Sequence, residues 1–344
     1  MNISDIFKSA AEKKASDIHL VAGLPPIFRI NGKLGKTQAQ ALDNKSIERL
    51  VFSILTPEQK ERFVSQKELD FGFELDGIVR LRVNLHYERS NVGMVARLIS
   101  GKIPTLEDIE MPEVIYKLLG LDKGLILVTG PTGCGKSTTL AAMINYINQK
   151  YSYNVITLED PIEYIFHPDK SVIIQRQLGS DMINFAEGLK HALRQDPDVI
   201  MVGEMRDLET IATTITLAET GHLVLATLHT YSAAQTINRI IDIFPSHQQS
   251  QIRLQLSLTL AGVISQRLLP TTDGSRTAAR EIMVNTPATA NIIRENKIPQ
   301  ISSVIETGSK EGMICLDKSV KELYKKGRID KEVAEIHMKN PEML

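Results

Sequence analysis

Residues 130–138 read Gly130-Pro131-Thr132-Gly133-Cys134-Gly135-Lys136-Ser137-Thr138, a complete Gly-x-x-x-x-Gly-Lys-Ser sequence. Its three glycines allow a turn in which successive backbone N–H groups face one concavity, and the following helix adds the positive end of its dipole. The nine residues are therefore predicted to bind the phosphates of a nucleotide. Lys136 would reach the β and γ phosphates, and the Ser137 hydroxyl would occupy an Mg²⁺ position.

The residues on either side of this loop support that prediction. The apolar run 125–128 before it predicts a buried strand. After it, Leu140, Met143, Ile144 and Ile147 recur at the spacing of an amphipathic helix. An ordinary glycine-rich turn is the competing interpretation, and it requires neither the strand nor the helix.

Composition limits the class of protein. The 344 residues are 42% hydrophobic, which suffices for two or three domains with a large core. The apolar stretches are of strand length and the first residues lack the features of a signal peptide, so we expect a cytoplasmic protein without a transmembrane segment. The two cysteines, Cys134 and Cys315, form no Cys-x-x-Cys pair, which predicts neither structural zinc nor a disulfide framework. A net charge of −1 lacks the basic excess of a nonspecific nucleic-acid-binding protein, although a local basic patch is not excluded.

The pattern of the chain changes near residue 100. Residues 1–100 predict a small α+β domain, with a strand at 79–86 whose apolar and basic residues alternate. A linker with Gly and Pro follows at 101–112. Residues 113–344 alternate strands with amphipathic helices, which predicts an α/β domain with a mostly parallel central sheet, and helices from about residue 286 complete it.

Four apolar runs, at 125–128, 155–158, 199–202 and 223–227, predict the central strands of this sheet. Ligands of open α/β sheets bind at the carboxyl ends of the strands. The first run leads into the phosphate loop, and each of the other three leads into residues suited to phosphate chemistry. We therefore expect these residues to form one site.

Carboxylates after two of these runs are candidate catalytic groups. Glu163 is predicted to be the general base that orients and deprotonates the attacking water, and Glu159 and Asp160 are alternatives that spacing does not exclude. Glu204 is the candidate for the metal-side carboxylate and would hold Mg²⁺ directly or through water. The alternative is that Glu204 is a surface carboxylate after a strand.

Histidine and arginine residues complete the set of candidates. His222 and His229 flank the fourth run, and His229 lies where a sensor of the γ-phosphate is expected; the alternative for each is a structural histidine. Arg82 and Arg97, in the first domain, are candidates for the added positive charge that accelerates phosphoryl transfer by about 10³ to 10⁵. The alternative is that both lie on a solvated face of a strand.

The chain resembles the type IV pilus retraction ATPases, the PilT-type twitching-motility proteins of the secretion ATPase superfamily. The resemblance covers essentially the whole chain. Its motifs are the phosphate loop, Ala-Ser-Asp-Ile-His-Leu at 15–20, Arg-Leu-Arg-Val-Asn at 80–84, Ile-Thr-Leu-Glu-Asp-Pro-Ile-Glu at 156–163, Val-Gly-Glu-Met-Arg-Asp-Leu-Glu-Thr at 202–210, Glu-Thr-Gly-His at 219–222 and Thr-Leu-His-Thr at 227–230.

The resemblance implies a homohexameric motor with a PAS-like N-terminal domain and a RecA-like P-loop domain, binding ATP and Mg²⁺ where a subunit's two domains meet. It implies these roles: catalytic base for Glu163, Walker B acid for Glu204, sensors of nucleotide state for His222 and His229, and charges that close onto the phosphates for Arg82 and Arg97. It also implies an inner-membrane platform protein as partner, met at the cytoplasmic face of the inner membrane, and a second retraction ATPase as a further partner.

Two features bear on the subtype. Assembly and type II secretion relatives commonly carry a tetracysteine zinc element, which two distant cysteines cannot form, so the resemblance favours retraction. Retraction members also carry Ala-Ile-Arg-Asn-Leu-Ile-Arg-Glu, which here reads Ala-Thr-Ala-Asn-Ile-Ile-Arg-Glu at 288–295. It departs at Ile292 and, more consequentially, at Thr289, which replaces an apolar residue, and at Ala290, which removes a charge. Cys134 replaces a serine usual in relatives, and its thiol is a candidate modification site.

The alternatives to a retraction motor are an accessory retraction ATPase acting with a second motor, a pilus assembly or type II secretion ATPase, and a ring that translocates nucleic acid.

Overall fold

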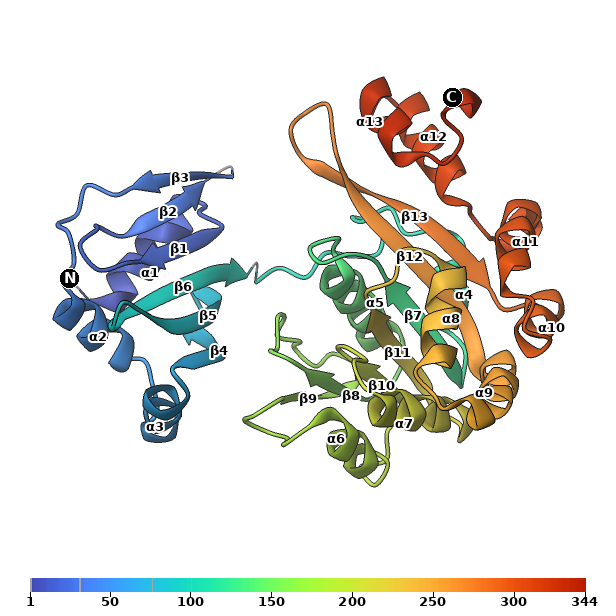
Figure 1. Cartoon of the computed structure of the whole chain (residues 1–344), viewed down its shortest axis with the longest axis horizontal. Coiled ribbons are helices and arrows are strands. Elements are labelled where there is room, and N and C mark those ends of the chain that lie inside the picture. Colours follow the sequence, from blue (N-terminus) through green and yellow to red (C-terminus); the bar gives the residue numbers. More distant parts are fainter. Residues whose placement is uncertain (1, 31, 76, 100) are drawn as a thin grey trace. The chain divides into compact units, whose positions relative to one another are not determined.

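The computed structural model describes residues 2–30, 32–75, 77–99 and 101–344 (Figure 1). The chain divides into two compact units. The first contains Met1–Lys102 with the short segment Pro161–Ile165, and the second contains Ile103–Asp160 and Phe166–Leu344. The predicted boundary at residue 100 falls on a residue outside the described ranges, and the domain limits 1–100 and 113–344 stay predictions.

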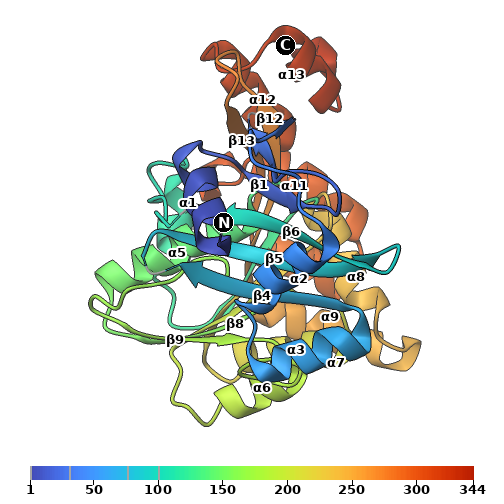
Figure 2. The ribbon, with the colours of Figure 1, turned by 90° about the vertical axis from the view of Figure 1, so that its left-hand side faces the viewer.

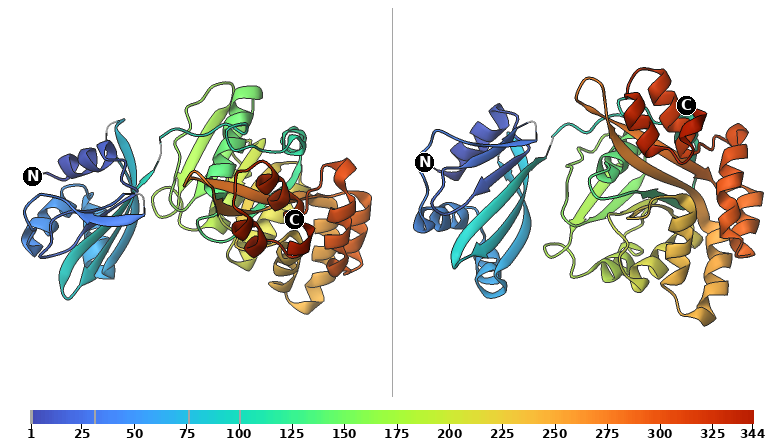
Figure 3. Two further views of the ribbon diagram at one scale, coloured as in Figure 1. Left: turned by 90° about the horizontal axis from the view of Figure 1, so that it is seen from above. Right: turned by 45° about the horizontal axis from the view of Figure 1, so that its top comes forward.

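The first unit is an antiparallel sheet with helices on one side (Figures 2 and 3). Its strands lie in the order β3-β2-β1-β6-β5-β4. Leu81, Val83 and Leu85 of β5 are fully buried, while Arg80 and Arg82 stay partly exposed, so the predicted alternation is confirmed. The elements are α1 (Ile3–Glu12), β1 (Asp17–Leu20), β2 (Ile27–Ile30), β3 (Lys33–Lys36), α2 (Asn44–Phe52), α3 (Pro57–Gln66), β4 (Glu68–Leu75), β5 (Val79–Glu88) and β6 (Asn91–Ile99).

The second unit is built on a mostly parallel sheet in the order β13-β12-β7-β11-β10-β8-β9. Neighbouring strands run parallel except β12 and β13, which form an antiparallel hairpin. The four predicted apolar runs are the adjacent strands β7, β11, β10 and β8, as expected for an α/β fold. The strands are β7 (Gly124–Thr129), β8 (Asn154–Glu159), β9 (Val172–Gln177), β10 (Val199–Val202), β11 (Leu223–Leu228), β12 (Leu260–Pro270) and β13 (Arg276–Val284).

Helices cover this sheet and extend beyond it at the C-terminal end (Figure 1). Leu140, Met143, Ile144 and Ile147 of α5 are all buried, which confirms the predicted amphipathic face. The helices are α4 (Glu113–Leu118), α5 (Lys136–Lys150), α6 (Phe185–Ala192), α7 (Leu208–Glu219), α8 (Ala233–Asp242), α9 (Ser246–Thr259), α10 (Pro287–Arg294), η1 (Ile298–Gln300), α11 (Ile301–Thr307), η2 (Ser309–Glu311), α12 (Leu316–Lys325), α13 (Lys331–His337) and η3 (Pro341–Met343).

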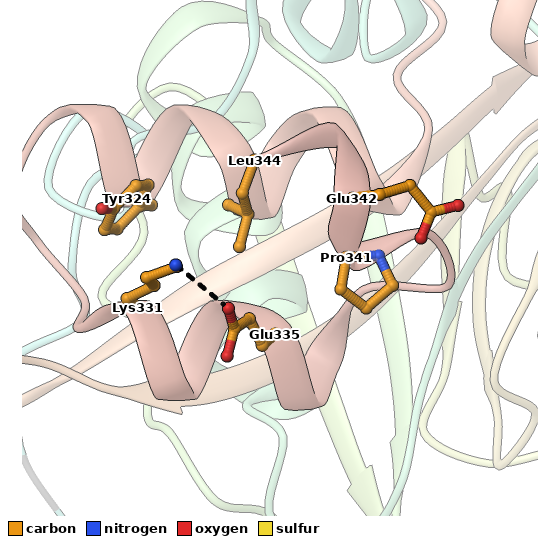
Figure 4. Close-up of a pocket in the computed structure, with 6 residues that line it drawn as sticks. All are labelled: Tyr324, Lys331, Glu335, Pro341, Glu342 and Leu344. Carbon is orange, nitrogen blue, oxygen red and sulfur yellow. Dashed lines mark ion pairs between the residues drawn. The ribbon is translucent and has the colours of Figure 1, made fainter.

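A pocket lies among α12, α13 and the C-terminal residues (Figure 4). An ion pair of 3.5 Å between Lys331 and Glu335 forms part of its wall. The carboxylate of Asp317 accepts the N–H groups of Lys339 at 2.8 Å and Asn340 at 3.0 Å, which fixes the end of the chain beside α12. The predicted site residues do not line this pocket, so we assign it no part in the site.

The structure explains one departure from the retraction motif. Thr289 is fully buried and closes a capping box at the start of α10, because its hydroxyl accepts the Thr286 N–H at 2.6 Å while Thr286 accepts the Thr289 N–H at 3.3 Å. The Thr289 hydroxyl also lies 3.1 Å from the Val284 carbonyl. Threonine at this position therefore completes the cap of the helix by bonding back to the N-cap residue Thr286, a role that an apolar residue cannot fill.

We expect Thr289→Val to lower the free energy of unfolding by about 1–2 kcal/mol, because it keeps the side-chain shape and removes the buried capping hydroxyl. Urea unfolding measures the change. Thr307→Val is the matched control, since that hydroxyl is exposed and bonds only within α11; it should cost less than about 0.5 kcal/mol. Equal losses for the two variants would contradict the capping role.

Candidate active site

The phosphate loop leaves the core through three residues with positive φ. Gly130, Gly133 and Gly135 have φ of 143°, 79° and 90°, values that side chains with a Cβ rarely adopt. The loop joins the fully buried β7 to α5, and Gly135 is the N-cap of that helix. Because glycine has no side chain to cap the helix, the first turn of α5 can serve a bound anion, as the sequence predicts.

Lys136 is held against the loop by backbone oxygens. Its Nζ donates to the carbonyls of Gly130 at 2.8 Å and Pro131 at 3.1 Å, and it lies 3.5 Å from Nδ1 of His229. The ammonium group therefore lies inside the turn of the loop, next to the residue that follows β11. This is a position from which it can exchange carbonyl oxygens for phosphate oxygens.

Glu204 and His229 meet at the carboxyl edge of the sheet. Glu204 follows β10, and its Oε1 lies 3.3 Å from Nε2 of His229 and is bonded to Nε of Arg206. With Nδ1 facing the Lys136 ammonium, the neutral tautomer protonated on Nε2 satisfies both contacts of His229. The structure thus brings Lys136, His229 and Glu204 into one continuous chain of polar contacts.

The environment of Glu204 keeps its carboxylate ionised. Its side chain is only 21% exposed. Burial raises the pKa of Glu204, but the hydrogen bond and charge of Arg206, together with His229, outweigh it and hold that pKa below its usual value. The interpretation of Glu204 as a merely solvated surface carboxylate does not fit these contacts.

The donor atoms at this edge fit Mg²⁺ only with help from a substrate. The Glu204 carboxylate and the Ser137 hydroxyl supply oxygens, which Mg²⁺ prefers. Across the described residues, no group of three or more His, Cys, Asp or Glu side chains is arranged to hold a metal. The fit is therefore that of an ion held partly by phosphate oxygens and water, not by a closed protein cage.

The alternatives for the catalytic base differ in their surroundings. Glu159 is 7% exposed and accepts hydrogen bonds from Thr157 at 2.7 Å and Gln175 at 3.0 Å, so its carboxylate joins β8 to β9. Asp160 is exposed, and its charge contributes to the raised pKa of Arg206, after the larger contribution of Glu204. The bonds of Glu159 favour a structural role and leave Asp160 and Glu163 as the stronger candidates.

Glu163 lies in the segment Pro161–Ile165, which belongs to the first unit. Its carboxylate is 35% exposed and lies 4.0 Å from Nη1 of Arg82. Next to it, Nε of Arg80 donates to the Ile162 carbonyl at 3.2 Å. Arg80 and Arg82 on the basic face of β5 thus contact the segment that carries the candidate base. This contact shows that the face is not simply solvated, which spacing alone left open.

Arg97 pairs directly with Arg82 across β5 and β6. Its Nε donates to Asp17 at 3.0 Å, while 70% of the side chain is exposed. Burial raises the pKa of Asp17, but hydrogen bonds from Ser16 and Arg97 lower that pKa by more than burial raises it, so the carboxylate stays charged. Asp17 therefore orients the Arg97 guanidinium through Nε, while most of the side chain stays exposed. A fully solvated arginine would have no such partner.

His222 and His229 lie at opposite ends of β11. His222 precedes the strand, and its Nδ1 lies 3.0 Å from the Leu217 carbonyl in the last turn of α7. His229 follows the strand beside the phosphate loop. Because β11 runs parallel to β7 for six paired residues, His222 lies about 20 Å from the edge that carries the loop. Within one chain, only His229 joins the site.

The surroundings of Cys134 do not favour the modification of its thiol that the sequence allows. Cys134 is 3% exposed, and burial raises the pKa of its thiol despite the nearby Lys136. A buried thiol with a raised pKa has little thiolate, so the candidate modification site in the loop is not supported.

Known proteins match this chain over almost its whole length. The family profile of type II/IV secretion system proteins matches residues 1–339. The type IV pilus retraction ATPase PilT of Pseudomonas aeruginosa is 45% identical over 342 residues, which cover 99% of each chain. The chain belongs to this family and is a PilT-type protein.

Two further likenesses extend this result. The type IV pilus ATPase PilU of Pseudomonas aeruginosa is 39% identical over 98% of this chain and 88% of its own length. A crystal structure of the pilus retraction motor PilT with bound ADP has a TM-score of 0.93, at 44% identity, over 100% of this chain and 99% of that one. The PilT-type fold therefore includes both units, with the antiparallel first sheet and the mostly parallel second sheet.

Two residues of the PilT-type site were not assigned a role from the sequence. Arg206 lies inside the motif at 202–210. Its position two residues after Glu204 is the sequence feature that could have indicated its contact with that carboxylate. Gln266 of β12 contacts the loop at Cys134, which lies 132 positions earlier in the chain, and no motif marks it. Among the described residues, the helices are too short or too polar to cross a membrane.

We expect Asp17→Asn to destabilise the N-terminal unit at about pH 7 by about 1 kcal/mol, because it removes the charge paired with Arg97. Since the folded-state pKa of Asp17 is lowered, its contribution is complete above the unfolded value of about 3.9 and disappears as the pH falls through the folded value. Urea unfolding of the full chain at about pH 7 and about pH 3, followed by circular dichroism, measures the difference between variant and wild type.

Asp70→Asn serves as the control, because Asp70 is an exposed carboxylate on β4 of the same sheet. Its effect should be small at both pH values. The role of Asp17 is contradicted if the two variants differ from wild type equally, or if the deficit of Asp17→Asn is as large at about pH 3 as at about pH 7.

Proposed function

We propose that this PilT-type protein is an ATP-hydrolysing motor that powers retraction of type IV pili. The observation that carries the proposal is the chain of contacts from Lys136 through His229 to Glu204, at the carboxyl edge of β7, β11 and β10. These are the groups that phosphoryl transfer needs beside a phosphate loop. Their occurrence in a chain related to PilT over its full length supports the motor over other P-loop functions.

The loop residues bind and orient ATP. The backbone of residues 130–138 cradles the phosphates, and Lys136 turns from the carbonyls of Gly130 and Pro131 to the β and γ phosphates. Phosphate is the stronger acceptor because it is charged. Ser137 and Glu204 would hold Mg²⁺, which would neutralise charge on the phosphate oxygens.

Hydrolysis then needs a base and added positive charge. Glu163 takes a proton from the attacking water, since it is accessible and Glu159 already accepts two hydrogen bonds. Arg82 and Arg97 place their guanidinium groups on the γ-phosphate as charge develops there. The partial exposure of both arginines leaves them able to meet a phosphate.

His229 reports the state of the nucleotide. One of its ring nitrogens faces Lys136 and the other faces Glu204, so a move of the lysine onto phosphate removes one of the two contacts that position the ring beside Glu204. His222 senses the nucleotide less directly, through the end of α7 that it contacts. This division of roles follows from the opposite ends of β11 that the two residues occupy.

The assembly follows the family resemblance. The subunits form a homohexamer, a PAS-like domain at 1–100 is joined by the linker 101–112 to a RecA-like domain at 113–344, and the ring acts on a platform protein at the cytoplasmic face of the inner membrane. The likeness to PilU raises a second candidate, an accessory ATPase that assists another motor. The identity to PilT is higher, and Glu163 and Glu204 are both present, which favours the motor.

Steady-state hydrolysis by the purified protein separates these candidates. A motor should turn over ATP alone, whereas a well-formed hexamer with negligible turnover would support the accessory role. DNA-stimulated turnover would instead support a nucleic-acid translocase, which the net charge of −1 disfavours. The two cysteines cannot form the tetracysteine zinc element common in assembly and type II secretion relatives.

We expect Glu163→Gln to bind ATP with nearly unchanged affinity and to lose at least about 100-fold in kcat, because an amide cannot accept the proton of water. Binding of a fluorescent ATP analogue and steady-state turnover measure the two effects. Lys136→Ala is the comparison variant and should weaken binding as well as turnover. Glu163→Gln with wild-type kcat would make Asp160 the base.

Deletion of the gene tests the direction of the motor in cells. We expect cells with surface pili and no retraction or twitching, because pilins would still be assembled but not withdrawn. Electron microscopy of pili and a motility assay measure both outcomes. Complementation with Glu163→Gln should not restore motility, whereas wild type should. Loss of surface pili would contradict retraction and indicate an assembly ATPase.

A further inference from the structure

Gln266 is a buried polar residue directly beside the phosphate loop. It lies on β12, next to β7, and is 2% exposed. The β12 residue before it, Ser265, pairs with Thr129, the last residue of β7. This register places Gln266 level with the start of the loop and outside the set of residues that touch nucleotide in the proposed function.

Both ends of the Gln266 amide bond to the loop and its helix. Nε2 donates to the Cys134 carbonyl at 2.7 Å, and Oε1 accepts the Thr139 hydroxyl at 2.9 Å. The orientation of the amide is fixed, because a carbonyl can only accept and the Thr139 hydroxyl supplies the proton for Oε1. One side chain thereby joins the middle of the loop to the first turn of α5.

The backbone of Gln266 limits the loop as well. A Cβ placed on Gly130 would overlap the Gln266 carbonyl oxygen and would lie 2.6 Å from Sγ of Cys134. A Cβ on Gly135 would come within 3.3 Å of Nε2 of Gln266. The glycines at both ends of the loop therefore lie against Gln266, so the loop is packed onto β12 and not only turned by its own φ angles.

The bond to Cys134 has a direct consequence for phosphate binding. In a trans peptide the C=O of one residue and the N–H of the next point in opposite directions. When Gln266 holds the Cys134 carbonyl toward β12, the N–H of Gly135 must point away from β12. Orientation of such N–H groups is what makes a glycine-rich loop a phosphate cradle.

We propose that Gln266 is a positioning residue that holds the phosphate loop in its phosphate-binding conformation through the Cys134 carbonyl. It acts on nucleotide through the loop and does not touch the nucleotide itself. Loss of the Gln266 side chain should therefore weaken nucleotide binding more than it lowers the kcat for bound ATP. The inference rests on the proposed function of the loop, and Lys136→Ala tests that function separately.

The experiment compares variants of the full chain for binding of a fluorescent ADP analogue, for KM and kcat, and for thermal stability. Gln266→Met has similar length but cannot hydrogen-bond; we expect it to weaken ADP binding and raise KM by about tenfold or more, with kcat within about threefold of wild type. Ser265→Ala is the matched control. It removes a buried hydroxyl bonded to Thr129 on the neighbouring strand and should leave ADP affinity within about twofold of wild type.

Gln266→Glu adds a test by pH. At about pH 8 the introduced carboxylate cannot donate to the Cys134 carbonyl, so ADP affinity should fall by about tenfold or more. Burial favours the neutral carboxyl, which can donate, so part of the affinity should return at about pH 5.5 relative to wild type at the same pH. Gln266→Met should show no such recovery.

The outcomes are distinct. Wild-type ADP affinity in Gln266→Met overturns the inference, as does a loss in Ser265→Ala as large as that in Gln266→Met, because the effect would then be general core packing. If Gln266→Met does not fold, Gln266→Glu decides, and the lack of any recovery at low pH overturns the proposal. If Lys136→Ala keeps wild-type affinity, the loop itself is not the nucleotide site and the proposed function fails instead.

Discussion

The turn from β7 into α5 is the constraint on which the rest of the site depends. A fully buried strand must leave the core and begin a helix within six residues, and the backbone does so with positive φ at Gly130, Gly133 and Gly135. Left-handed conformations cost other residues about 1–2 kcal/mol each, so the spacing of the glycines follows from the path of the chain. Lys136 inside the turn and Gln266 outside it bond to the loop carbonyls, and together they hold one backbone conformation.

A series of polar contacts connects this loop to the neighbouring strands. Arg206, Glu204, His229 and Lys136 follow one another at hydrogen-bonding or near hydrogen-bonding distances. Charge-assisted hydrogen bonds of this kind contribute about 1.5–3 kcal/mol each where they are partly buried. A change of partner at Lys136 therefore has a short physical route to Glu204, because only the His229 ring lies between them.

The first unit carries a second row of charges, formed by strand register. Arg29, Asp17, Arg97 and Arg82 are paired in turn across β2, β1, β6 and β5. This row contains one carboxylate and three guanidinium groups. Asp17 pairs with Arg29 and Arg97, while Arg82 lies 4.0 Å from Glu163. An alternating strand predicts that such residues share a face, and the sheet order decides which of them become neighbours.

The sequence by itself determined the α/β fold class, the four central strands, the phosphate loop and the family. These features are local, since a period of two or 3.6 residues and a glycine spacing are present in a short window of sequence. It also placed Glu204 and His229 at the ends of strands, because parallel strands bring their carboxyl ends to one edge. The choice among Glu159, Asp160 and Glu163 was not local, and hydrogen bonds between β8 and β9 now set Glu159 apart.

Only the tertiary structure decided the remaining features. His222 and His229 look equivalent around one strand in the sequence, yet a strand of six residues separates them to opposite edges of the sheet. Cys134 is a candidate for modification in the sequence, yet it is buried, and its carbonyl accepts a hydrogen bond from Gln266 of β12. Gln266 contacts the loop at Cys134, 132 positions earlier in the chain, because β12 adds to the sheet beside β7 after several crossovers. Such contacts depend on the order of strands, which no local pattern in the chain contains.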